Sequence, residues 1–182
     1  MEASIKRVLI AALAVFFSLG SMGVSAARGS RATEKAMIEK TIRDSICWAL
    51  TKDTALRDST MAQDKDLFYF GPGSMDTVDG WDQHVKQFAT WMDPRFKAVR
   101  TEVRDLRVHL SRSGDVAWFS AFLDDVVEWD GKRFGGEDQR WTGVLEKRAG
   151  KWLIVQMHFS LASDKVAAQV KAKMEAAKNG KE

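Results

Sequence analysis

Residues 140–162, RWTGVLEKRAGKWLIVQMHFSLA, predict two long strands joined by a tight turn at Arg148-Ala149-Gly150. A glycine in a three-residue turn suits a left-handed position and leaves a bulge in the ladder. We expect this register, with Lys147 opposite Lys151, because it gives the hairpin one apolar face that other segments must cover. That face holds Trp141, Leu145, Leu153, Val155, Met157, Phe159 and Leu161. The opposite face holds Arg140, Thr142, Val144, Glu146, Trp152, Ile154, Gln156, His158 and Ser160.

The first 26 residues have the pattern of a secretory signal peptide. Lys6 and Arg7 precede an apolar run over residues 8–19, and Val24-Ser25-Ala26 offers a cleavage site of small residues. The alternative, a retained anchor, is less favoured because a membrane span needs about 20 apolar residues. We therefore expect a periplasmic or secreted protein whose mature chain begins near Ala27.

The composition fits one domain and argues against several classes of protein. The chain has 182 residues, of which 45% are hydrophobic, enough for one packed core. The formal charge of +3 is spread over interleaved acidic and basic residues. Because no basic stripe with spaced aromatic residues is present, we do not expect nucleic-acid binding, nor a membrane partner once the signal segment is cleaved. Cys47 is the only cysteine, so no intrachain disulfide can form.

The sequence predicts neither a metal site nor a cofactor. The three histidines fall in three different expected elements, without the spacing of zinc ligands. Asp76, Asp79 and Asp82 do not follow the alternating pattern of a calcium loop. Carboxylates near the start of a helix are favoured by the helix dipole, which accounts for these three.

The hydrophobic periodicity changes from helical to alternating along the chain. It predicts helices over residues 34–51, over 53–62 and from Asp79, with a short strand at 66–70 before Gly71-Pro72. From Phe96 onward it predicts four long antiparallel strands, with a bulge near Arg104-Asp105. The fold class that follows is α+β: three helices packed on a curved antiparallel sheet of four long strands and one short strand. The domain spans residues 33–163, and a last helix and tail occupy residues 164–182.

Three short motifs carry a resemblance to a known family: Arg140-Trp-Thr-Gly-Val-Leu145, Gly150-Lys-Trp-Leu-Ile-Val155 and His158-Phe-Ser160. Over residues 33–163 the chain resembles the SnoaL-like branch of the nuclear transport factor two-like (ketosteroid isomerase-like) superfamily. The second and third motifs also look like the association domain of calmodulin-dependent kinase II. The resemblance implies a cone-like fold with a cavity between the helices and the concave face of the sheet. It does not imply one function, since the fold hosts isomerases, cyclases, dehydratases and non-catalytic hubs.

The catalytic parts of the ketosteroid isomerases are missing from the matching positions. Gly71 stands where the resemblance places the catalytic aspartate, just before a proline. Cys47 stands near the position of the tyrosine that binds the oxyanion, and residues 141–143 offer no aspartic acid as the second donor. We therefore expect no activity of that kind.

Three residues remain as candidates for acid–base chemistry. Tyr69, the only tyrosine, could point its hydroxyl into the cavity or could simply find a buried hydrogen-bond partner. Asp124 and Asp125 point to opposite sides of a strand, so one of them could enter the cavity, where burial would raise its pKa. The alternative is that a bulge or strand end leaves both in solvent.

The aromatic content predicts a pocket for a small apolar organic ligand. The expected lining is Trp48, Tyr69, Trp118, Trp141 and Met157, and pockets with many aromatic walls and few polar anchors suit such ligands. We therefore predict an exported small-molecule-binding domain. The alternatives are a SnoaL-like enzyme (isomerase, cyclase or hydratase) and a non-catalytic oligomerisation module.

The polar face of the hairpin predicts a homodimer formed through the sheet. Ile154 lies there among Arg140, Gln156 and His158 in the expected register, and this mixture is typical of an interface with a polar rim. A structural network within the sheet is the alternative for the His158 cluster.

Overall fold

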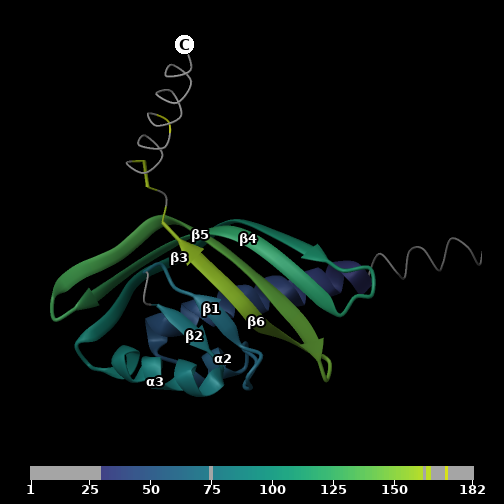
Figure 1. Cartoon of the computed structure of the whole chain (residues 1–182), viewed down its shortest axis with the longest axis horizontal. Helices are drawn as coiled ribbons and strands as arrows, with labels where there is room; N and C mark the ends of the chain where they lie inside the picture. Colours follow the sequence, from purple (N-terminus) through teal and green to yellow (C-terminus); the bar gives the residue numbers. More distant parts are fainter. Residues whose placement is uncertain (1–29, 74–75, 162, 165–170, 172–182) are drawn as a thin grey trace, which may run out of the picture.

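The computed structural model describes residues 30–73, 76–161, 163–164 and 171. The predicted signal peptide lies outside these residues, as does the predicted C-terminal helix apart from Asp164 and Lys171. Figure 1 shows the long strands arching over α2, α3 and two short strands. No helix of the described residues is long and apolar enough to cross a membrane.

Helices and short strands precede a run of long strands. The first helix covers residues 30–51 and is followed by α2 (Thr54–Asp58), β1 (Phe68–Phe70), β2 (Thr77–Asp79) and α3 (Trp81–Met92). The long strands are β3 (Phe96–Leu110), β4 (Val116–Trp129), β5 (Lys132–Arg148) and β6 (Lys151–Ser160). All six strands form one sheet in the order β2-β1-β6-β5-β4-β3.

The α+β class is confirmed, and the sheet differs from the prediction in two respects. It is mixed rather than wholly antiparallel, because β1 pairs parallel with β6. It also has a second short strand, β2, which pairs antiparallel with β1 where the sequence analysis expected a helix to begin. The four long strands pair antiparallel with their neighbours as expected.

Local sequence explains where several elements begin and end. Asp53 caps α2, because its carboxylate accepts a hydrogen bond from the backbone N–H of Leu56 at 2.9 Å. Asp130 and Gly131 have φ of 49° and 80°, the two left-handed positions of the tight turn that joins β4 to β5. The predicted bulge in β3 is confirmed, since the register shifts between Arg104 and Arg107.

The register of the β5–β6 hairpin differs from the predicted one. Arg148 pairs with Lys151 across a two-residue turn, in which Ala149 and Gly150 have φ of 48° and 80°. The bulge lies further along, where the partners shift between Val144 and Leu145. Both turn residues are left-handed, which matches the strand twist and allows the shorter turn.

This register turns Trp152 and Ile154 toward the core. Ile154 pairs with Leu145 and is 0% exposed, so the prediction that it lies on the outer interface face is wrong. Trp152 is buried as well, and its indole N–H donates to Glu34 of the first helix at 2.7 Å. Burial of two large apolar side chains against the first helix stabilises this register over the predicted one.

The core lies between the helices and the concave face of the sheet. Ile38 and Ile42 of the first helix, Leu123 of β4, and Trp141 and Leu145 of β5 are fully buried there. Trp141 packs edge-on against Phe119 and parallel to Phe159. The predicted core positions of Trp141, Leu145 and Met157 are confirmed.

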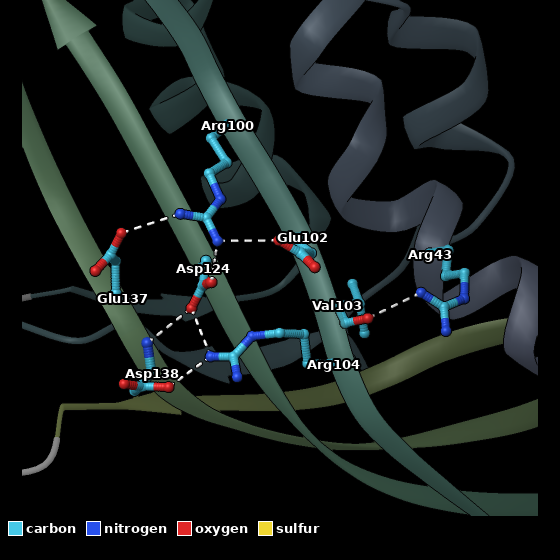
Figure 2. Close-up of polar contacts among 8 residues, drawn as sticks. All are labelled: Arg43, Arg100, Glu102, Val103, Arg104, Asp124, Glu137 and Asp138. Atoms are coloured by element: carbon cyan, nitrogen blue, oxygen red, sulfur yellow. Dashed lines mark hydrogen bonds and ion pairs between the residues drawn. The ribbon is translucent and has the colours of Figure 1, made fainter.

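The convex face carries a cluster of charges around Asp124 (Figure 2). Asp124 is 3% exposed and accepts hydrogen bonds from Arg100 at 2.7 Å, Arg104 at 2.9 Å and the backbone N–H of Asp138 at 2.9 Å. The hydrogen bond from Arg104 lowers the pKa of Asp124, with help from the Asp138 N–H. Asp138 has φ of 56° and lies where the pairing of β5 with β4 shifts. The cluster therefore connects this irregular part of β5 to the bulged part of β3.

Candidate functional site

A cavity of about 540 Å³ lies between the helices and the concave face of the sheet. The first helix and α3 form one wall, and residues of β1, β4, β5 and β6 form the other. Most of the lining is aromatic or aliphatic. The aromatic side chains of the lining, besides Tyr69 and His84, are Trp48, Phe88, Trp91, Phe96, Trp129, Phe134 and Phe159.

Tyr69 and His84 form a hydrogen-bonded pair in this lining. The Tyr69 hydroxyl lies 3.0 Å from Nδ1 of His84 and 3.4 Å from Oε1 of Gln87, to which it donates. Tyr69 comes from β1 and both partners come from α3, so the pair ties the helix to the sheet. Burial raises the pKa of Tyr69 above its ordinary value, so the phenol stays protonated and keeps a hydrogen to donate.

His84 is 0% exposed and is held among aromatic rings. The indole of Trp81 stacks on it at 5.0 Å, and the ring of Phe88 meets it edge-on at 4.2 Å. This burial, together with the smaller effect of the nearby Arg57 charge, lowers the pKa of His84 to about 3. His84 is therefore neutral near pH 7, and its Nε2 has no partner among the described residues.

Asp125 is the one carboxyl that reaches the cavity from the sheet. Its Oδ1 accepts a hydrogen bond from the Thr101 hydroxyl at 3.2 Å, and burial raises its pKa. The neighbouring Asp124 points to the opposite face, where two arginines lower its pKa. The two adjacent carboxyl groups therefore have pKa values shifted in opposite directions, because they lie on opposite faces of the strand.

Gly135 fixes the backbone behind Asp125. It has φ of 110°, and a Cβ added there would come within 2.1 Å of the Asp125 carbonyl oxygen. Only glycine permits both this conformation and this close approach. Gly135 therefore allows β5 to pack closely against the backbone of Asp125, whose side chain lines the cavity.

Arg57 of α2 lies behind the aromatic wall. Its guanidinium is 4.3 Å from the centroid of Phe88 and 5.3 Å from that of Trp48, and it pairs with Asp58. The side chain is buried but does not line the cavity. Its contacts with the ring faces are cation–π interactions that hold the wall in place.

The structure brings together three of the five predicted lining residues. Trp48, Tyr69 and Met157 line the cavity. Trp118 does not, since it is 48% exposed on the convex face and stacks on His109. Trp141 is buried in the core and stacks on Phe159, and Phe159 rather than Trp141 lines the cavity. The lining prediction is therefore wrong for the last two residues.

The acid–base candidates separate in the same way. Asp125 and Tyr69 line the cavity, whereas Asp124 belongs to the charge cluster on the convex face. The sequence analysis missed His84 and Gln87 as lining residues. Their signal was available in principle, because they lie three apart on α3 and so share one face of a helix.

The predicted interface residues are on the convex face with one exception. Arg140 and His158 are exposed there and Gln156 is half-buried, whereas Ile154 is in the core. Trp118 is the exposed apolar side chain that this face offers instead.

Three further observations bear on the chemistry of this region. No group of three or more His, Cys, Asp or Glu side chains that could hold a metal ion is found within residues 30–73 and 76–161. Gly71 lines the cavity where the ketosteroid isomerases carry their base, and a Cβ there would meet Asp76 Cβ at 2.5 Å. Burial raises the pKa of Cys47, which disfavours a thiolate nucleophile.

Comparison with known proteins supports the fold. A family model of the SnoaL-like domain matches residues 38–164, whereas a search among curated proteins gives no match. An NTF2-like superfamily protein from Salmonella enterica serovar Typhimurium has a TM-score of 0.63 and 18% identity, over 74% of this chain and 95% of that chain.

Two other solved structures are similar to this chain over about the same share of its length. A proposed dehydratase of the NTF2-like family from Streptomyces avermitilis has a TM-score of 0.62 and 15% identity, over 73% of this chain and 99% of that chain. An NTF2-like protein of unknown function in nutrient uptake from Rhodospirillum rubrum has a TM-score of 0.55 and 20% identity, over 70% of this chain and 98% of that chain. At these identities the likeness concerns the fold alone.

Proposed function

This chain belongs to the SnoaL-like domain family, and we propose that it is an exported protein that binds a small organic molecule in its cavity. The observation that carries the proposal is the aromatic cavity of about 540 Å³. Its volume lies within the roughly 300–1,000 Å³ that is usual for small-molecule sites. Its polar groups are few and neutral or acidic, which favours an apolar body with one or two polar anchors.

The expected affinity is modest. A ligand of about 15–20 non-hydrogen atoms, at about −0.3 kcal/mol per atom, binds with about −5 to −6 kcal/mol, which corresponds to tens to hundreds of micromolar. Trp48, Trp91 and Trp129 line the cavity, so binding should quench tryptophan fluorescence. The melting temperature should rise only at ligand concentrations well above the dissociation constant.

A filled-cavity variant tests the proposal. Ala49 lines the cavity on the first helix, whereas the neighbouring Leu50 is exposed. We expect Ala49→Phe to abolish fluorescence quenching by a panel of aromatic and terpenoid compounds, and Leu50→Phe to leave it unchanged. Circular dichroism checks that both variants are folded. Equal quenching in the two variants would place binding elsewhere and refute the proposal.

Acid–base catalysis is the second candidate, favoured by the position of Asp125. A carboxyl of raised pKa in a cavity can donate a proton to a leaving hydroxyl group. The Tyr69 hydroxyl can donate its one hydrogen to a substrate carbonyl in place of Gln87. The isomerase, cyclase and hydratase reactions all need such a pair. An Asp125→Asn variant that binds compounds as the wild type does, but loses turnover of one of them, would establish this function.

Export rests on the sequence of residues 1–26. The basic residues, the apolar run and the small-residue site together favour cleavage near Ala27 and release into the periplasm or medium. Amino-terminal sequencing of protein from the native host is the test. An intact Met1 would refute export by this route.

We also propose a homodimer formed through the convex face of the sheet. Arg140, Gln156 and His158 lie on that face, and Trp118 and Phe122 supply exposed apolar surface beside them. Trp118→Glu should weaken the dimer without unfolding the protein, because the side chain lies outside the core. A wild-type monomer in sedimentation at high micromolar concentration would refute the dimer.

A further inference from the structure

Asp125 is half-buried in the cavity wall and lacks the cationic partners that Asp124 has. Asp124, the preceding residue, meets two arginines and a backbone N–H. Asp125 receives one hydrogen bond, from the neutral Thr101 hydroxyl, and no ion pair to it is found among the described residues. A carboxylate that is partly removed from water and has no cation beside it is disfavoured in its charged form, and a cation that enters the cavity would stabilise it.

The rest of the lining supplies acceptors and ring faces but no cation. It contains no lysine or arginine, and its second carboxylate, Asp76, comes from the loop after β1. His84 is neutral, since burial lowers its pKa to about 3, and Tyr69 is neutral because burial raises its pKa. Arg57, which lies behind the aromatic wall, is already paired with Asp58.

The aromatic walls suit a positive charge as well as an apolar body. Trp48, Phe88 and Trp91 pack against one another with centroid separations of 4.9 to 6.0 Å and line the same cavity as Asp125. Ring faces attract cations, most strongly where water is excluded. An anionic ligand would instead meet two carboxylates and no compensating charge.

We propose that the ligand of this cavity is a protonated amine with an apolar, aromatic or aliphatic body, and that Asp125 is its counter-ion. The inference rests on the proposed binding function and adds the chemical class of the ligand. The ammonium group donates hydrogen bonds to the Asp125 carboxylate, and its body lies against the rings of the first helix and α3. The bound amine then keeps Asp125 ionised, as the arginines do for Asp124.

Three probes with one apolar body test the charge preference: 2-(1-naphthyl)ethylamine, 2-(1-naphthyl)ethanol and 1-naphthylacetate. With about 13 non-hydrogen atoms each, the neutral probe should bind at about millimolar dissociation constants, which ligand-observed NMR measures. We expect the amine to bind at least tenfold more tightly than the alcohol, and the carboxylate to bind most weakly. In Asp125→Asn the amine and the alcohol should bind equally.

The controls separate this inference from the binding function. Glu128→Gln removes a negative charge from the same strand at a half-buried position outside the lining, and it should keep the preference for the amine. Thr101→Val, which removes only the hydrogen bond to Asp125, should keep it too. Asp125→Ser, which removes the carboxylate, should lose the preference and serves if Asp125→Asn does not fold. Equal binding of amine and alcohol by the wild type would overturn the inference and leave the binding function standing. Failure of all three probes to bind at millimolar concentration would also overturn it, while the Ala49→Phe comparison decides the binding function separately.

Discussion

Neutral burial of His84 makes the stability of this domain depend on pH in a predictable window. The pKa of the imidazole is about 6.5 in an unfolded chain and about 3 in the folded protein. Between these values the unfolded state binds a proton that the folded state does not, so acid favours unfolding. The stability that comes from His84 is fully present above pH 6.5 and is lost progressively as the pH falls toward 3.

The magnitude follows from the width of the window. Each pH unit inside it costs about 1.4 kcal/mol, so a change from about pH 7.5 to about pH 4.5 should cost about 2–3 kcal/mol through His84 alone. Asp125 acts in the opposite sense, because its raised pKa favours the folded state in acid. A difference between wild type and His84→Gln cancels that contribution, since Asp125 is present in both proteins.

Urea unfolding followed by circular dichroism at several pH values is the assay. His84→Gln should be less stable than wild type near neutral pH, because it disturbs the ring packing and the contact with Tyr69. We expect that deficit to shrink, or to reverse, by about 2–3 kcal/mol on reaching about pH 4.5. His109→Gln, at an exposed position of β3, measures the effect of losing a histidine elsewhere. A deficit in His84→Gln that stays constant over this range would refute neutral burial of His84.

Three further substitutions test the packing. Trp141→Ala should cost about 3–5 kcal/mol in urea unfolding, because a fully buried ring is lost from the core; a cost below about 1 kcal/mol would contradict its placement. Gly135→Ala should destabilise more than Gly131→Ala, since both have positive φ but only the former would bring a Cβ against the Asp125 carbonyl; equal melting temperatures would contradict the close approach. Ile154→Lys should prevent folding rather than dissociate a dimer, and a folded monomer would restore the predicted register.

The sequence was sufficient for the class of fold because its strongest signals are local. Asp53 at a helix start, Asp130-Gly131 at a hairpin turn and the change of hydrophobic period at Phe96 each act within a few residues. The parallel pairing of β1 with β6 joins segments far apart in the chain, and a three-residue strand has no periodicity of its own. Its partner could therefore not be predicted from pattern.

The hairpin register failed for a related reason. Residues 152–155 are consecutively apolar, so alternation does not show which of them face the core. In the structure a bulge shifts the register of β6, so Ile154 and Met157 both face the core although they are three residues apart. The predictions for Trp118 and Ile154 depended on register or on strand parity, and both changed when those were known. Trp141 faces the core as predicted, but Phe159 stacks on it and lines the cavity in its place.

The candidate site was predictable where one residue was distinctive, as Tyr69 was, and unpredictable where it depended on a pair. His84 gains its importance from a contact with Tyr69 across 15 positions of sequence. Asp125 and Asp124 differ only in which side of β4 each one faces, and the arginines that distinguish them come from β3.

The most direct test of the central claim is mass spectrometry of small molecules released from the mature protein after gentle purification from its native host. We predict an organic molecule enriched above the background of an unrelated protein from the same host in the wild type and in Leu50→Phe, in substoichiometric amount because the affinity is modest, and its absence from Ala49→Phe, whose side chain fills the cavity. Release of no compound above that background, or equal release from both variants, would contradict the claim that this cavity binds a ligand.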